Sequence, residues 1–219
     1  MTRLDDSEIR RRVLAELDWD PSIDASDVGV AVKDGVVTLT GTIPSYWQEK
    51  EVERVVKRIA GVRAVAEELT IKLPGNSERS DADIAQSALN GLRFNVAVPT
   101  KSIQVTVEKG WVTLDGQVEW QYQRAAAESE VKYLMGVRGV TNNIEIKPKV
   151  STSDVKAKIE EAFERLAQLD ANQITIEARD GKVILRGNVR TCDEKDQAEQ
   201  AAWAAPGVTS VENHVVVAQ

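Results

Sequence analysis

Three short runs of alternating apolar and polar residues each break at a two-residue turn and then resume. They read "VAVKDGVVTLTG", "VTVEKGWVTLDG" and "IEARDGKVILRG". Two alternating runs joined by two turn residues predict a β-hairpin with one buried face. The turn glycines Gly35, Gly110 and Gly181 are 75 and 71 residues apart. A hairpin that recurs at nearly constant spacing predicts a tandem repeat.

Two further sets of glycines keep the same spacing, which extends the repeat well beyond the hairpin. The members of these sets are Gly41, Gly116 and Gly187, and then Gly61, Gly136 and Gly207. The stretches "KLPGNSERSD" and "KPKVSTSD" lie between the repeats and are rich in loop-forming residues. We therefore predict three domains, with the boundaries 1–74, 75–148 and 149–219.

Each repeat is predicted to open with a helix. The expected N-cap residues are Asp5, Ser80 and Ser151, each of which stands three positions before an acidic residue. One apolar stripe follows every cap at helical spacing. Its members are Ile9, Val13 and Leu17, then Ile84, Ala88 and Leu92, and then Val155, Ile159 and Phe163.

The hairpin turns have the residues that a type I′ turn requires. Asp34-Gly35 and Asp180-Gly181 suit this turn well, and Lys109-Gly110 suits it less well. A two-residue loop fixes the strand register. The predicted facing pairs are Val32 with Val37, Val30 with Leu39, Val107 with Val112, Val105 with Leu114, Ala178 with Val183, and Ile176 with Leu185.

A second helix and a last strand complete each repeat. Ser45 and Thr191 are expected to cap this helix, whereas Trp120 holds the same position in the middle repeat and has no side-chain acceptor. The helix is expected to end at the third set of glycines, each of which is followed by Val. We thus predict an α/β chain of three αββαβ repeats. Each is a two-layer sandwich with two helices on one face of a three-stranded mixed sheet.

This outline resembles the BON domain, a small bacterial module of osmotically inducible and nodulation-type proteins. The resemblance rests on three pairs of segments. They are "DGVVTLTGTI" with "EVERVVKRIAGVRAVAEELTI", "KGWVTLDGQV" with "VKYLMGVRGVTNNIEI", and "DGKVILRGNV" with "AAPGVTSVENHVVV". It implies a transport-associated binding module without catalytic activity, connected with phospholipid membranes and osmotic stress.

The charge and hydropathy of the chain limit the classes of partner that it can bind and the places where it can reside. Its net charge is −7, which disfavours nucleic acid as a partner. No stretch is long and apolar enough to span a bilayer, and "MTRLDDSEIRRRVLAEL" lacks the apolar core of a signal peptide. We expect a soluble cytoplasmic protein, or a periplasmic one if a signal peptide has been removed. The oligomeric state is left open.

Catalytic and metal-binding groups are scarce. His214 is the sole histidine, and its counterparts are Glu68 and Asn143, so a polar structural role is favoured. Cys192 is the sole cysteine and stands at a helix start, a place where the dipole can lower a thiol pKa. No base accompanies it, and we favour an inert thiol. We expect the chain to have no enzymatic activity and to bind neither a cofactor nor a metal.

Aromatic residues are the best candidates for contact with lipid or a protein partner, because they combine a flat apolar body with a polar tip. The candidates are Trp47, Tyr122, Trp120, Trp111 and Trp203. Packing between repeats or beneath loops is favoured for Trp111 and Trp203. For the position that Trp47 and Tyr122 share, such packing and contact with lipid or a partner are equally favoured. Trp19 and Phe94 share a slot after the first helix and are expected in the core.

The favoured function is a binding protein of the osmotic or envelope-stress type. It would attach to phospholipid or to an envelope-associated partner, and three linked weak contacts would bind more tightly than one. The alternative is a cytoplasmic scaffold that binds proteins through sheet edges or the exposed sheet face.

Overall fold

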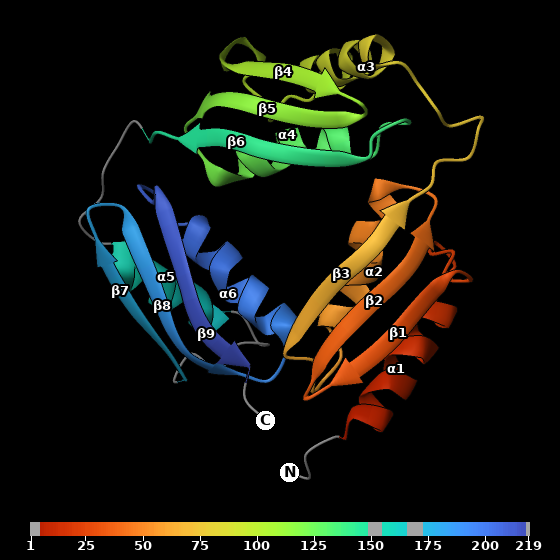
Figure 1. Ribbon diagram of the computed structural model, residues 1–219. Helices are drawn as coiled ribbons and strands as arrows, with labels where there is room; N and C mark the ends of the chain where they lie inside the picture. Colours follow the sequence, from red (N-terminus) through yellow and green to blue (C-terminus); the bar gives the residue numbers. More distant parts are fainter. Residues whose placement is uncertain (1–4, 149–154, 166–172, 218–219) are drawn as a thin grey trace. The chain divides into compact units, whose positions relative to one another are not determined.

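The computed structural model describes residues 5–148, 155–165 and 173–217. Each repeat forms helix, strand, strand, helix and strand in that order (Figure 1). The first repeat contains α1 (Asp6–Trp19), β1 (Val28–Lys33), β2 (Val36–Ile43), α2 (Tyr46–Lys57) and β3 (Ala64–Ile71). The second contains α3 (Asp81–Phe94), a 3-10 turn (Thr100–Ser102), β4 (Ile103–Glu108), β5 (Trp111–Val118), α4 (Gln121–Lys132) and β6 (Gly139–Ile146). The third contains α5 (Val155–Arg165), β7 (Ile174–Arg179), β8 (Lys182–Val189), α6 (Cys192–Trp203) and β9 (Ser210–Val217).

The strands form three separate three-stranded sheets, with the orders β1-β2-β3, β4-β5-β6 and β7-β8-β9. The first two strands of each sheet are antiparallel, and β6 and β9 run parallel to β5 and β8. Two helices cover one face of each sheet (Figure 1). The predicted α+β sandwich with mixed sheets is therefore confirmed in all three repeats.

The hairpins have the predicted register and turn. All six predicted facing pairs occur in the three antiparallel ladders. The first turn residues Asp34, Lys109 and Asp180 have φ values of 52°, 52° and 51°, and the glycines that follow are also positive. Positive φ at both central residues is the requirement of a type I′ turn. Lys109 accepts this conformation although lysine is a weaker choice there.

The helix caps follow the sequence closely. The Asp5 side chain accepts from the amide of Glu8, and Ser80 accepts from the amide of Asp83. Ser151 lies outside the described residues. Ser45 and Thr191 cap α2 and α6 as predicted, through the amides of Gln48 and Glu194.

The indole of Trp120 cannot accept a hydrogen bond, and the middle repeat compensates in another way. The Gln123 side chain accepts from the backbone amides of Glu119 and Trp120, at 3.0 and 3.1 Å. This is one half of a capping box, and it satisfies donors that lie just before the helix.

The end of the second helix differs from expectation. α2 ends at Lys57 and not at Gly61, and the chain then tightens into turns in which Arg58 and Ile59 donate to carbonyls three residues earlier. Three-residue hydrogen bonds commonly tighten the last part of a helix. Gly61 still has the expected left-handed conformation, with φ of 92°.

The apolar stripes predicted for the first helices all face a core, and the side chains named for them are buried. By its internal contacts the chain forms two compact units. One comprises residues 1–41, 51–69 and 150–219, and the other comprises 42–50 and 70–149. The third repeat therefore packs with most of the first, although the second repeat separates them in the sequence.

Candidate functional site

The most exposed aromatic side chains lie at the ends of the first helices of repeats one and two. Trp19 ends α1 with 84% of its surface exposed, and Phe94 ends α3 with 83% exposed. The expectation that these two residues belong to the core is wrong. The stripes at Leu17 and Leu92 already supply the inward face of each helix, and a position two residues further on points away from it.

Each of these helices also exposes an apolar residue five positions before the aromatic one, which lies about 140° around the helix. Leu14 accompanies Trp19, whereas Leu89 accompanies Phe94, and Val96 follows in the second repeat. We call these groups the helix-end patches. The first consists of Leu14 and Trp19, and the second of Leu89, Phe94 and Val96. Large apolar side chains exposed at corresponding positions of two repeats indicate a contact surface.

The corresponding positions of the third repeat hold charged residues in the sequence. Glu160 and Arg165 hold the positions that correspond to Leu14 and Trp19. Because the fold of the third repeat is the same, an exposed apolar pair is not needed to build it. The patches of the first two repeats therefore require an explanation other than folding.

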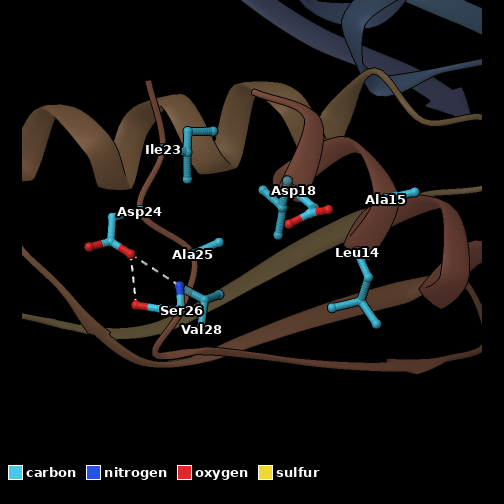
Figure 2. A pocket seen from close by; sticks show the side chains of 9 residues that line it. Leu14, Ala15, Asp18, Ile23, Asp24, Ala25, Ser26 and Val28 are labelled. Carbon is cyan, nitrogen blue, oxygen red and sulfur yellow. Dashed lines mark hydrogen bonds between the residues drawn. The ribbon is translucent and has the colours of Figure 1, made fainter. Parts of the chain in front are cut away.

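Two hollows flank the C-terminal half of α1. The first, of about 650 Å³, lies between this helix and the loop before β1 (Figure 2). Leu14 and Asp18 line it from the helix, and Asp24 and Ser26 line it from the loop. Asp24 accepts hydrogen bonds from the hydroxyl and the amide of Ser26, which lower its pKa. The carboxyl group therefore stays ionised and is a poor general acid.

The second hollow lies beside Trp19 and has a volume of about 670 Å³. Its charged lining residues are Arg11, Arg12, Arg58, Glu16 and Asp20. Arg11 and Arg12 both contact Glu8 at 2.8 Å. Guanidinium groups beside an exposed indole form a surface that can contact an anionic group and an apolar phase together.

The predicted slot of Trp47 and Tyr122 divides into two different environments. Trp47 is partly buried, and its ring centroid lies 6.0 Å from that of Tyr133 in the second repeat. Tyr122, in contrast, is 59% exposed at the start of α4. Trp47 thus contributes to packing, whereas Tyr122 remains a prediction as a contact residue.

The remaining predicted aromatic residues also differ. Trp120 is partly buried at the start of α4, and Trp203 packs against the core of the third repeat. Trp111 is half exposed on the open face of its sheet, where its indole nitrogen donates to Thr141 at 2.8 Å. No contact with lipid or a partner is established for any of the three.

Cys192 is buried at a contact between the third and first repeats. Its thiol lies 3.3 Å from the backbone carbonyl of Val62. Burial raises the thiol pKa, and the nearby carboxylate of Asp196 adds to this effect. The lowering that a helix start can produce does not occur at this thiol, because loss of hydration is the largest influence on its pKa. The preference for an inert thiol agrees with this environment.

An ion pair accompanies the thiol at the same contact. Lys57 of α2 lies 2.9 Å from Glu53 in its own helix and 3.4 Å from Asp196 of α6. Burial raises the pKa of Asp196 even though Lys57 opposes the shift. The start of α6 therefore docks on the end of α2 through one thiol contact and one ion pair.

Among residues 5–148, 155–165 and 173–217 there is no group of three or more potential metal ligands. Within the same ranges, no helix combines the length and the apolar character needed to cross a membrane. His214 is exposed and lies 3.7 Å from Glu212.

The fold defines a tandem-repeat protein of small α+β modules. Comparison with known families matches the BON domain to residues 5–72, 80–148 and 151–219. The chain belongs to the BON domain family.

One relative of the chain is the osmotically-inducible protein Y of Escherichia coli (strain K12). It is 32% identical over 148 residues, which cover 66% of this chain and 74% of the relative. Two solved structures of CdsD, a structural protein of the type III secretion system of Chlamydia trachomatis, are similar at 16% identity. One covers 95% of this chain and 91% of CdsD with a TM-score of 0.27. The other, of its C-terminal domain, covers 99% and 100% with a TM-score of 0.26.

Proposed function

We propose that the chain is a non-catalytic binding protein of the osmotic or envelope-stress type, which attaches to a phospholipid surface through its helix-end patches. Family membership and the name of the E. coli relative support the stress class. The exposure of Trp19 and Phe94 at equivalent helix ends carries the proposal for the contact surface.

The chemistry of the first patch suits the boundary between headgroups and acyl chains. An indole prefers this boundary because its ring is apolar and its N–H is polar. Arg58 lines the adjacent hollow and can approach a phosphate group, whereas Arg11 and Arg12 in the same hollow already contact Glu8. The net charge of −7 opposes attachment elsewhere on the molecule, so binding depends on these local features.

Attachment by two small patches is expected to be weak at each patch. Burying one aromatic side chain contributes roughly 1.5–3 kcal/mol, which alone does not hold a protein at a surface. Two patches on one chain raise the apparent affinity when both bind one vesicle.

Vesicle flotation tests the proposal. The chain is mixed with vesicles of phosphatidylglycerol and phosphatidylethanolamine, or of phosphatidylcholine alone. We expect it to float with the anionic vesicles, and the double variant Trp19→Ala, Phe94→Ala to lose most of this binding. Glu160→Ala, at the corresponding position of the third repeat, is the matched control and should bind as the parent does.

Two outcomes would reject the proposed surface. If the parent binds no vesicle, attachment to phospholipid is wrong. If Trp47→Ala with Tyr122→Ala abolishes flotation while the helix-end variant retains it, the contact lies at the start of the second helices.

A protein scaffold is the second candidate, because each described sheet ends in an outer strand on both sides. β2, β5 and β8 are central, which leaves the outer strands of each sheet able to accept a partner strand. A pull-down from salt-shocked cells distinguishes the two functions. Capture of a specific protein that survives Trp19→Ala with Phe94→Ala would favour the scaffold.

A further inference from the structure

The open face of the second sheet carries an exposed indole that lies flat on the strands. Trp111 is the first residue of β5 and pairs with Glu108 on one side and Gly139 on the other. A Cβ atom added to Gly139 would lie 2.4 Å from two carbons of the Trp111 ring. The indole therefore packs directly over the backbone of β6, in space that any other residue would fill.

The corresponding positions in the other repeats show that this arrangement is particular to the second. Val36 and Lys182 occupy the slot of Trp111, whereas Ala64 and Ser210 occupy the slot of Gly139. A tryptophan and the glycine that makes room for it thus occur together in one repeat only. The hydrogen bond from the indole nitrogen to Thr141 fixes the ring further. One side of the ring is held by the sheet, and Trp111 remains 50% exposed.

Polar side chains continue from the indole along the same face in register. Thr106, Thr113 and Thr141 form the next row across the sheet, and Gln104, Asp115 and Asn143 form the row after it. Gln117 and Glu145 form the last row. Hydroxyl, amide and carboxylate groups thus extend along one side of a flat aromatic ring.

The charge of this face limits what it can bind. Its rows carry Glu108, Asp115 and Glu145 but neither Lys nor Arg, and Lys147 just beyond them contacts Glu145 at 3.2 Å. Phosphate-bearing partners are repelled by such a surface. The face is therefore distinct in chemistry from the patch beside Trp19.

We propose that this face binds a neutral oligosaccharide, with one pyranose ring stacked on Trp111 and the following sugars along the polar rows. A pyranose with equatorial hydroxyls has a flat C–H face that packs against an aromatic ring, while its hydroxyls need donors and acceptors at the rim. Asp115 accepts from Asn143 and Glu145 accepts from Gln117, so both carboxylates are already oriented as acceptors. A ring fixed before binding loses little entropy when the ligand arrives.

The test uses the full chain, labelled with ¹⁵N, and follows the indole N–H resonances of its tryptophans. Cellohexaose, in which all hydroxyls are equatorial, is the probe. We expect saturable shifts centred on the Trp111 resonance, with a dissociation constant on the order of 1 mM. The matching galactose oligomer, which has an axial hydroxyl on each ring, should bind less tightly.

Two variants and one control locate the site. Trp111→Ala should weaken binding by at least about tenfold, and Gly139→Ala should weaken it because its Cβ displaces the indole. Tyr122→Ala removes another exposed aromatic residue of the same repeat and should bind as the parent does. Unchanged amide resonances of α3 and α4, which lie in the second repeat on the covered side of its sheet, establish that each variant is folded.

Three results would overturn the proposal. The first is the absence of any shift with cellohexaose at about ten times the expected dissociation constant. The second is equal binding by the parent and Trp111→Ala. The third is an arginine-rich peptide that shifts the Trp111 resonance where cellohexaose does not, since this would assign the indole and Glu108 to a cationic protein partner.

Discussion

The carboxylate of Asp6 accepts a hydrogen bond at 2.9 Å from the backbone amide of Gly35, 29 residues further along the chain. Its other oxygen accepts from the amide of Asp34 at 2.7 Å. One side chain in the first turn of α1 thus holds both amides of the hairpin turn. Asp81 makes the same two bonds to Lys109 and Gly110 in the second repeat.

We expect Asp6→Ala to lower the free energy of unfolding of the first repeat by about 1–3 kcal/mol, because Gly35 is buried and its amide loses a charged acceptor. Urea unfolding measures this loss. Asp18→Ala removes the same charge from the exposed side of the helix and should change stability by less than about 0.5 kcal/mol. A loss for Asp6→Ala no larger than that for Asp18→Ala would contradict a stabilising role of the bonds to the turn.

Gly41→Ala is expected to be more disruptive. An added Cβ would lie 1.9 Å from the carbonyl oxygen of Asp27, and the φ of Gly41 is 113°, outside the range of most side chains. The contact with a backbone oxygen and the positive φ cannot be relieved by moving a side chain. We therefore expect the free energy of unfolding to fall by about 3 kcal/mol or more.

Gly75→Ala in the first linker is the matched control, because no atom lies within 4 Å of its added Cβ. Thermal unfolding of both variants provides the comparison. Similar unfolding temperatures for the two would contradict the assignment of Gly41 to a steric requirement.

Acidic conditions should leave Glu8 ionised. Hydrogen bonds from Arg11 and Arg12 lower its pKa from 4.5 to about 2. A lowered folded-state pKa means that the stabilisation is complete above pH 4.5 and is lost as the pH falls toward 2. A titration followed by ¹³C NMR of the side-chain carboxyl groups should find Glu8 charged at about pH 3.

Replacing both arginines by glutamine should return the Glu8 midpoint toward its ordinary value. Arg54→Gln removes an arginine that pairs with Glu51 and should leave the Glu8 midpoint unchanged. A normal Glu8 midpoint in the parent would contradict the pairing.

The periodic pattern of the sequence predicted the fold well, because turn residues and alternating apolar residues determine each hairpin from a short stretch of chain. The pairing of Val30 with Leu39 follows from a two-residue turn, and a slip by one position would expose every buried side chain. The surface was harder to predict. Trp19 stands two residues after the buried Leu17, so it points outward only if α1 extends that far, and the sequence did not fix where α1 ends. Glycine at 139 was a usable signal for the position of Trp111, because it alone departs from Ala64 and Ser210.

The contact between α6 and α2 makes Cys192 a reporter for docking of the third repeat on the first. Its thiol is buried against Val62, and its raised pKa reduces the reactive thiolate at pH 8. Alkylation by a small maleimide should therefore be slow in the native chain and fast in urea. Lys57→Ala removes the partner of Asp196 and should speed native alkylation on the order of tenfold, because this contact opens more often.

Lys132→Ala is the matched control, since Lys132 holds the same position in the second repeat and lies over the ring of Tyr133 at 5.0 Å. It should leave the alkylation rate unchanged. If Lys57→Ala has no effect either, the third repeat alone shields the thiol. If both variants accelerate alkylation equally, the effect of Lys57→Ala does not come from loss of the ion pair with Asp196.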